Sequence, residues 1–430
     1  MRSNDTNSVR PIVSEILADG SIVETIHIAE VNRTEFAVCR PDGSITREQQ
    51  VELDDGRRLV PVSSATDLIA TGCVLLPSDV GDFGDKGDLL EEIKSYFHRY
   101  VDLSPAFEDI AAYYVLLTWV YDAFNELPYL RFRGDYGTGK TRALLTIGSI
   151  CYKPFFASGA STVSPLFHVL NAFNGTMILD EADFRFSDAT AELTKILNNG
   201  NMRGLPVLRT MTTKNRELVP RAFRVYGPKI IGMRTAFTDR ALESRFLTEE
   251  TGCRPIRPDI PIHTPDTLRT DAQALRNKLL AWRFRARHLV GPDPSRVIFG
   301  IEPRLNQTAL ALLSLVDDEA VRNRLRDELV GHEARVRDER ASTDDAIMLR
   351  ALLDAFAVSS ARHVAVAEAA KRFNLLAAAQ GGVEITAKKA GIFIRTHLRL
   401  TTTKTNGVYV VPVVEFPKIL TLAHRFAVAL

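Results

Sequence analysis

One stretch constrains the fold more than any other: residues 129–145, YLRFRGDYGTGKTRALL, are typical of a short strand, a glycine-rich turn and a helix. Glycine allows the backbone to curl, so that successive N–H groups and the N-terminus of the helix point at one anion. Lys140 adds a mobile positive charge, and Thr141 adds a hydroxyl that can bind Mg²⁺. The pattern therefore predicts a cradle for the phosphates of a nucleotide. Its residues are Gly134, Asp135, Tyr136, Gly137, Thr138, Gly139, Lys140, Thr141 and Arg142.

A second stretch, GTMILDEAD at residues 175–183, is an apolar run that ends in carboxylates. This is typical of a central parallel strand whose carboxyl end carries the chemistry. We expect Asp180 to hold Mg²⁺, through water, and Glu181 to polarise the water that attacks the γ-phosphate. Asp183 is more typical of a helix cap or a solvated loop. Together the two stretches predict that the protein uses ATP and Mg²⁺ and is an ATP hydrolase.

The overall composition, with 45% hydrophobic and 25% charged residues in a chain of 430, is typical of a soluble globular protein with two to four domains. No apolar run approaches the roughly 18 residues that span a bilayer. The first residues are polar, without the core of a signal peptide. We therefore expect a cytoplasmic location and no membrane partner. The four cysteines are far apart, which indicates neither a zinc site nor a disulfide framework.

The net charge of +1 conceals an uneven distribution. Residues 360–430 hold ten Lys or Arg against three Asp or Glu, whereas residues 1–100 hold ten against eighteen. A basic end on a nearly neutral protein favours a polyanionic partner, although a solvated surface is an equally common explanation.

The order of patterns along the chain predicts an α/β fold with several domains. Short alternating runs separated by turns indicate a β-rich N-terminal domain at 1–76, and a Gly- and Asp-rich linker with a helix follows at 77–104. Strands alternating with helices at 105–250 favour a parallel sheet covered on both faces. Helical periodicity continues through 251–340, which we expect to form a helical lid. Three helices, predicted at Asp344–Phe356, His363–Phe373 and Ile385–Leu398, and a hairpin with an Asn-Gly turn predict a winged-helix domain at 341–430.

Two features between 204 and 246 are candidate functional elements. Two extended runs at 204–226, joined by a polar turn that carries Lys214 and Arg216, predict a hairpin with a basic tip. A solvated turn without function is the alternative. After the next strand come Arg240 and Arg245, which are placed to reach the γ-phosphate bound by a neighbouring subunit. A surface salt bridge is the alternative for each arginine.

The third helix of the C-terminal region has two different faces. One face is apolar and suited to packing, while the other carries Lys388 and Arg395, with Lys389 adjacent. Lys404 lies in the predicted wing. These four cations are candidate contacts to DNA phosphates.

With these motifs in view, the chain from about residue 102 onward resembles the AAA+ ring helicase-like ATPases of phages and mobile genetic elements. It is more distantly similar to minichromosome-maintenance and superfamily-three helicases. The resemblance is carried by GDYGTGKT as Walker A, TMILDEAD as Walker B, the hairpin as a pre-sensor insertion, and ESRFL, with Arg245, as the arginine-finger segment. Arg304 would be a lid arginine within 251–340, and the winged helix completes the match. The N-terminal 76 residues lie outside the resemblance.

The resemblance implies a homo-oligomeric ring, most simply a hexamer, that binds DNA and acts as a helicase or translocase in replication. Such proteins often have an asparagine after the strand that ends near Met233, where this chain has Arg234 and Thr235. Either residue is a candidate for orienting the attacking water. Two alternatives stay open: an AAA+ remodelling or switch ATPase that acts on a protein partner, as a loader, regulator or defence component, and a sequence-specific DNA-binding protein whose assembly ATP controls.

Overall fold

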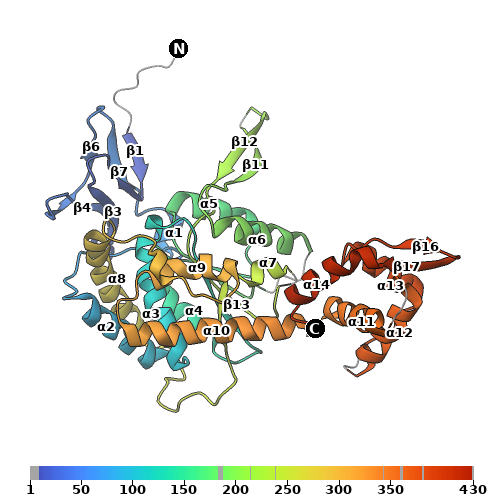
Figure 1. Cartoon of the computed structure of the whole chain (residues 1–430). Helices are drawn as coiled ribbons and strands as arrows, with labels where there is room; N and C mark the ends of the chain where they lie inside the picture. Colours follow the sequence, from blue (N-terminus) through green and yellow to red (C-terminus); the bar gives the residue numbers. More distant parts are fainter. Residues whose placement is uncertain are drawn as a thin grey trace. The chain divides into compact units, whose positions relative to one another are not determined.

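The structure is a computed structural model that describes residues 9–182, 187–213, 215–237, 239–341, 343–358, 362–379 and 382–428, without the side chains at 183–190, 240–241 and 336–340. Its contacts divide the chain into two compact units, Met1–Glu328 and Leu329–Leu430 (Figure 1). This division falls within the stretch that the sequence assigns to the helical region 251–340. The five finer boundaries therefore stay predictions.

The first unit is built on a five-stranded parallel sheet in the order β14-β8-β13-β10-β9. The predicted mixed α/β fold with a parallel sheet is thus confirmed. The middle strands β8, β13 and β10 are almost entirely buried, as expected for a sheet covered on both faces. The strands are β8 (Tyr129–Arg133), β9 (Phe155–Ser158), β10 (Met177–Asp180), β13 (Lys229–Met233) and β14 (Phe246–Glu250).

Helices cover both faces of this sheet. Met177 and Leu179 of β10 belong to the same core as the apolar faces of α5 and α6. Ile178, which alternates with them, lies on the face of α4, where a Cβ at Gly148 would be 2.9 Å from its Cγ1. The helices of this unit are α2 (Lys86–Tyr100), α3 (Pro105–Val120), α4 (Lys140–Ser149), α5 (Val163–Phe173), α6 (Ser187–Gly200), α7 (Arg240–Glu243), α8 (Thr267–Ala286), α9 (Pro303–Leu313) and α10 (Glu319–Ala341), which crosses the boundary of the two units.

Helix α8, which the sequence places in the 251–340 region, packs on α2, α3 and α4. The buried Arg276 of α8 donates from Nη1 to the carbonyl of Ser149, 2.6 Å away at the end of α4. Asn277 accepts a 2.9 Å hydrogen bond from the backbone N–H of Ser78. These contacts join α8 to the body of the first unit rather than leaving it as part of a separate lid.

The N-terminal region forms two small sheets, β2-β3-β4-β5 and β1-β7-β6. Antiparallel pairing runs through the first, and β1 pairs with β7 in parallel in the second. The elements are β1 (Val9–Ile12), β2 (Ser14–Ile16), β3 (Ile22–Ile28), β4 (Arg33–Cys39), β5 (Ile45–Glu48), β6 (Val51–Glu52), β7 (Arg58–Pro61) and α1 (Asp67–Ala70).

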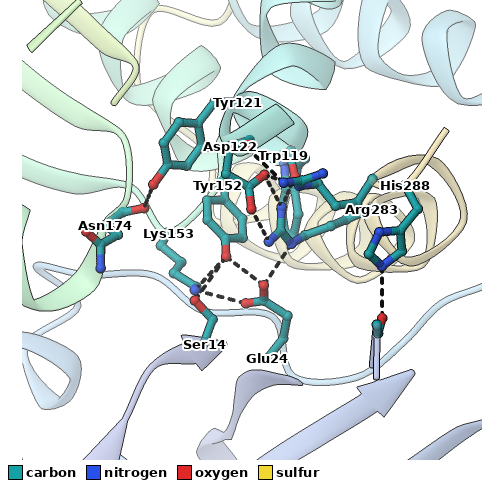
Figure 2. Close-up of polar contacts among 12 residues, drawn as sticks. Ser14, Glu24, Trp119, Tyr121, Asp122, Tyr152, Lys153, Asn174, Arg283 and His288 are labelled. Atoms are coloured by element: carbon teal, nitrogen blue, oxygen red, sulfur yellow. Dashed lines mark hydrogen bonds and ion pairs between the residues drawn. The ribbon is translucent and has the colours of Figure 1, made fainter. Parts of the chain in front are cut away.

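A buried ion cluster joins β3 to the core of the same unit (Figure 2). Glu24 of β3 accepts hydrogen bonds from Arg283 Nε of α8 at 2.7 Å and from the Tyr152 hydroxyl at 2.6 Å. It also lies 2.9 Å from Lys153 Nζ. Burial lowers the pKa of Lys153 to about 8, although Glu24 opposes the shift. An unpaired buried charge is costly, and Glu24 is the carboxylate that pairs with Arg283 and Lys153. Glu24 is therefore a structural part of the core, although it lies in the N-terminal region.

The predicted hairpin at 204–226 is present as β11 (Val207–Thr212) and β12 (Leu218–Phe223), and Figure 1 shows it projecting beyond α5. At its root, Arg209 of β11 lies 3.0 Å from Glu192 of α6. Arg209 and Arg221 lie directly opposite each other across the two strands. At the tip, Arg216 is exposed and has a left-handed φ of 61°, while Lys214 lies outside the described residues.

The second unit has a small sheet, β15-β17-β16, packed with four helices. One expectation is corrected: the predicted second helix does not begin at His363, because His363–Ala365 pair with β17 and the helix starts at Val366. The sequence analysis also missed the last helix. The elements are α11 (Asp344–Val358), β15 (His363–Ala365), α12 (Val366–Ala378), α13 (Ala387–Thr396), β16 (Thr403–Thr405), β17 (Val408–Pro412) and α14 (Phe416–Arg425).

Candidate nucleotide-binding site

The glycine-rich turn lies between the buried strand β8 and helix α4. Gly139 is the N-cap of α4 and has a φ of 87°, a conformation that favours glycine. The N-terminus of α4 therefore opens directly onto the turn, where its first N–H groups are available to an anion.

The ammonium of Lys140 lies inside the curl of the turn. Nζ donates to the carbonyl oxygens of Gly134 at 2.7 Å and Asp135 at 2.6 Å. The positive charge is thus held next to the N-terminus of α4, and both favour bound phosphate.

The two residues predicted to hold Mg²⁺ are in contact although 39 positions separate them. The Thr141 hydroxyl donates to Asp180 Oδ2 at 2.6 Å. Gly232 of β13 makes room for this pair, because a Cβ at that position would be 2.9 Å from Asp180 Oδ1. The described residues contain no cluster of three His, Cys, Asp or Glu suited to a metal. One hydroxyl and one carboxylate fit Mg²⁺, which usually keeps several waters and binds substrate phosphates.

Glu181 follows directly at the end of β10 and is exposed. Its backbone N–H donates to Asp180 Oδ1 at 2.9 Å, and its φ is 52°, in the left-handed region. Such a conformation is costly for a residue other than glycine and is often found at functional sites. Gly159 permits it, since a Cβ there would be 2.6 Å from the Glu181 carbonyl oxygen.

Arg234, one of the two candidates after β13, lies beside the phosphate loop. Its guanidinium carbon is 3.5 Å from the centroid of the Tyr136 ring, and the Tyr136 side chain is largely exposed. Thr235 is exposed. Both follow Met233, whose strand is the neighbour of β10 in the sheet, so they are near Asp180 and Glu181 in the topology.

A segment that the sequence analysis did not single out covers the turn. Thr251, just after β14, bonds through its hydroxyl to the hydroxyl of Thr138 at 2.8 Å. Arg142 donates to the carbonyl of Ile262 at 2.8 Å. Thr251 lies beside the turn because it directly follows β14, which pairs with β8. This pairing cannot be read from the sequence, so the sequence gives no sign of the role of Thr251.

The candidate arginines differ in their surroundings. Arg245 is buried, with its Nη1 donating to Asn198 Oδ1 of α6 and its Nε without a partner among the described residues. Burial lowers the pKa of Arg245, and the nearby charge of Arg304 adds to this shift. Arg240 begins α7, and its side chain lies outside the described residues. Arg245 therefore faces the interior of its own unit, contrary to the outward position that the sequence suggested.

The candidate DNA contacts of the second unit all lie on its surface. Lys388, Lys389 and Arg395 of α13 are exposed, as is Lys404 of β16. Arg395 donates to the Thr402 hydroxyl at 2.9 Å and lies 6.0 Å from the centroid of the Tyr409 ring in β17. The helix and the hairpin thus present their cations together. No helix in the described part of the chain has the length and apolar character that crossing a bilayer requires.

No protein-family model and no curated protein matches this chain. Among solved structures, the SCCmec type IV Cch active helicase is 12% identical with a TM-score of 0.44, covering 96% of this chain and 80% of that one. The C-terminal region of NrS-1 is 12% identical with a TM-score of 0.40, covering 91% and 96%. The Aeropyrum pernix ORC1 protein in complex with DNA is 14% identical with a TM-score of 0.22, covering 78% and 96%. The fold and site define the chain as an α/β protein with a glycine-rich turn between a strand and a helix on a parallel sheet.

Proposed function

We propose that the protein is an ATP-driven DNA helicase or translocase of the AAA+ kind, acting in replication as an oligomeric ring, most simply a hexamer. The observation that carries the proposal is the 2.6 Å contact between the Thr141 hydroxyl, in the first turn of α4 after β8, and the Asp180 carboxylate at the carboxyl end of β10. Lys140 and Glu181 are the adjacent residues on each side, so the groups required for ATP hydrolysis converge at one edge of the sheet.

Different residues of the candidate site would carry out different parts of ATP hydrolysis. Residues 134–142 and the N-terminus of α4 bind the phosphates, with Lys140 as the mobile charge. Thr141 and Asp180 hold Mg²⁺, which when bound neutralises charge on the phosphate oxygens. Glu181, exposed directly after the end of β10, orients the attacking water. Arg234 is our first candidate, ahead of Thr235, for orienting the water from β13.

A neighbouring subunit would complete each site. Because Arg245 is committed to Asn198 inside its own unit, we place Arg240 first as the residue that reaches the neighbour's γ-phosphate. Such an arginine stabilises the charge of the transition state.

DNA is the proposed partner because cations occupy two exposed elements. The hairpin tip, with Lys214 and Arg216, would line the channel of the ring. The winged helix, with Lys388, Lys389, Arg395 and Lys404, would attach to DNA phosphates without reading sequence. Hydrolysis at the carboxyl ends of β10 and β13 would move the hairpin, which is inserted between α6 and β13.

The decisive experiment is strand displacement on forked DNA, measured together with ATP hydrolysis. A Lys214→Ala, Arg216→Ala double variant is expected to keep its ATPase and lose unwinding. Arg269→Ala, which removes an exposed arginine from α8, is the matched control and should unwind normally. Normal unwinding by the double variant would remove the hairpin from the mechanism.

One observation favours the second candidate, an AAA+ ATPase that remodels a protein partner. The exposed face of the hairpin carries apolar side chains, with Leu208 and Leu218 71% and 73% exposed. An exposed apolar face along the hairpin is suited to gripping a polypeptide. ATPase that is stimulated by unfolded protein and not by DNA would favour this candidate.

A further inference from the structure

A groove opens between the N-terminal strands and the root of the hairpin, with a cavity volume of about 1150 Å³. Residues 10–15 form one wall, and residues 203–206 and 222–226 form the other. Asn174 and Tyr226 of the groove lie just before β10 and β13 begin, whereas Asp180 lies where β10 ends. The groove is therefore at the opposite edge of the sheet from the candidate nucleotide site, and its residues take no part in the proposed function.

The acidic side chains that line the groove, Asp122 and Glu15, already have positive partners. Asp122 accepts hydrogen bonds from Arg283 at 3.0 Å and from Arg287 at 2.7 Å. Burial opposes the shift, but these two arginines lower the pKa of Asp122 well below its usual range. Glu15 lies 3.5 Å from Arg10 of the same wall. The negative charges of the groove are thus compensated.

Two arginines of the other wall keep their positive charges. Arg203 and Arg224 are exposed, and neither makes an ion pair within the part of the chain that the structure describes. Arg203 donates to the backbone carbonyl of Asp122 at 2.6 Å and lies 5.4 Å from the centroid of the Tyr226 ring, and neither contact cancels its charge. The backbone N–H of Arg224 donates to the side chain of Asn171 at 3.0 Å, which holds this residue beside α5. The groove therefore offers two guanidinium groups to a negatively charged ligand.

Exposed apolar side chains lie beside these charges. Leu205 is 48% exposed on the wall that holds Arg203, and the exposed Pro206 follows it. Pro11 is exposed on the other wall. Sites for small molecules have volumes of about 300–1,000 Å³, so this groove has room for a longer ligand. Its surface suits a ligand that carries both acidic and apolar groups.

Two features favour a polypeptide over a single strand of nucleic acid. Nucleic-acid bases need exposed aromatic rings on which to stack. Here the Tyr121 ring is buried, with its hydroxyl donating to the Asn174 carbonyl at 2.7 Å (Figure 2), and Arg203 lies over the Tyr226 ring.

The second feature is the C-terminal end of α5, which lines the groove through residues 171, 172 and 174. The partial negative charge of a helix C-terminus disfavours a dense row of phosphates. A polypeptide has N–H groups that the last carbonyl oxygens of a helix can accept, and it can place separate carboxylates on separate arginines.

We propose that the groove binds an extended acidic segment of a protein partner, with carboxylates on Arg203 and Arg224 and an apolar side chain against Leu205. This interaction goes beyond the proposed function and does not depend on it, because the groove and the candidate nucleotide site lie at opposite edges of the sheet. The bound segment would contact both the N-terminal strands and the root of the hairpin.

The test begins with a random peptide library displayed against the full chain. Selected peptides are expected to combine Asp or Glu with a large apolar residue, and the most enriched one is labelled with fluorescein and measured by anisotropy. The Arg203→Gln, Arg224→Gln double variant should bind it at least about tenfold more weakly, because charge-assisted hydrogen bonds are lost. Its ATPase should equal that of the wild type.

Arg221→Gln is the matched control. Arg221 is an exposed arginine of β12, and it points to the opposite face of the hairpin from Ala222, its neighbour in the groove. This variant should bind the peptide like the wild type. Thermal unfolding checks that the double variant is folded. As a test that leaves the protein unchanged, the same peptide with Gln and Asn in place of Glu and Asp should bind the wild type at least about tenfold more weakly.

Three results would overturn the proposal. The selected peptides could lack acidic residues, or bind the neutral and acidic forms equally, which would exclude recognition of carboxylates. The double variant could bind the peptide like the wild type, which would place the peptide outside the groove. It could also lose binding to an oligodeoxythymidylate while keeping the peptide, which would make the groove a DNA site. The first two results leave the proposed function intact, whereas absence of strand displacement by the wild type would contradict that function without affecting the groove.

Discussion

The guanidinium carbon of Arg234 lies 3.5 Å from the centroid of the Tyr136 ring, so a residue at the end of β13 stacks on a residue of the phosphate loop. This contact connects the strand that follows the hairpin to the loop expected to bind nucleotide. A cation over an aromatic face contributes about 0.5–1 kcal/mol at an exposed site. The contact is therefore strong enough to position Arg234 and weak enough to be exchanged for a bound phosphate.

We predict that Arg234→Ala lowers the kcat of ATP hydrolysis at least about tenfold, because it removes a charge near the reacting phosphate. Arg234→Lys should recover part of the loss. Tyr136→Phe keeps the aromatic face and is the matched control, with kcat within about twofold of the wild type. If Arg234→Ala and the wild type have equal kcat, Thr235 rather than Arg234 would be the candidate for orienting the attacking water.

The contact between Thr141 and Asp180 predicts a change in the Mg²⁺ requirement. Thr141→Ala should raise the Mg²⁺ concentration for half-maximal ATPase about tenfold or more, whereas Thr141→Ser keeps the hydroxyl and should behave like the wild type. Combining Thr141→Ala with Asp180→Asn should cost less than the sum of the single effects, because both residues serve one ion. Strictly additive effects would contradict a shared site.

Substitutions at two further residues should distinguish ATP binding from ATP hydrolysis. Lys140→Ala is expected to weaken ATP binding, since Lys140 contacts ground-state phosphates, while Glu181→Gln is expected to bind ATP and stop hydrolysis. Equilibrium binding of a labelled ATP analogue and steady-state turnover measure the two properties. Normal turnover by Glu181→Gln would remove its assignment as the residue that orients water.

Mixed assemblies test whether subunits share a site. Chains with Arg240→Ala mixed with chains with Glu181→Gln should recover part of the ATPase, because some interfaces then combine both native residues. The same mixture with Arg245→Ala should recover none, since Arg245 is buried against Asn198 in its own unit. The reverse pattern would make Arg245 the residue that reaches the neighbour.

We predict that the free energy of unfolding depends on pH because Lys229 is buried. Its buried Nζ donates to the carbonyls of Val225 at 2.8 Å and Gly227 at 2.9 Å, and burial lowers the pKa of Lys229 to about 7. The unfolded chain has the ordinary lysine pKa of about 10.4, so it binds this proton more tightly. The free energy of unfolding should therefore rise between pH 7 and 9, by at most about 1.4 kcal/mol per pH unit from this group. Urea unfolding of Lys229→Met should show a smaller rise, and an identical rise would contradict the assignment.

The local motifs could be predicted because each is formed by residues that are close together in the sequence. The glycine-rich turn lies between a strand and a helix as predicted, and the predicted hairpin is present, with its strands paired over 207–223 rather than 204–226. Asp180 could be assigned to the carboxyl end of a strand because four apolar or neutral residues precede it. Parallel strands with intervening helices place such ends at one edge of the sheet, so the meeting of Thr141 and Asp180 follows from topology.

Other features depend on partners that the sequence does not indicate. The start of the second helix in the C-terminal unit was misplaced because His363–Ala365 are drawn into pairing with β17, which overrides local helical periodicity. Arg245 lies in a charged segment that is typical of a surface, but packing against α6 buries it.

The sequence by itself determined the strand, turn and helix and the strand that ends in carboxylates, where we propose a nucleotide site, because strand, turn, cation and carboxylate are encoded within short windows. Only the tertiary structure decided that the N-terminal sheets belong to the core, through the contact between Glu24 and Arg283, which are 259 positions apart. The physical reason is that charge compensation depends on distance in space, and residues far apart in the chain carry no local sign of the partner that will neutralise them.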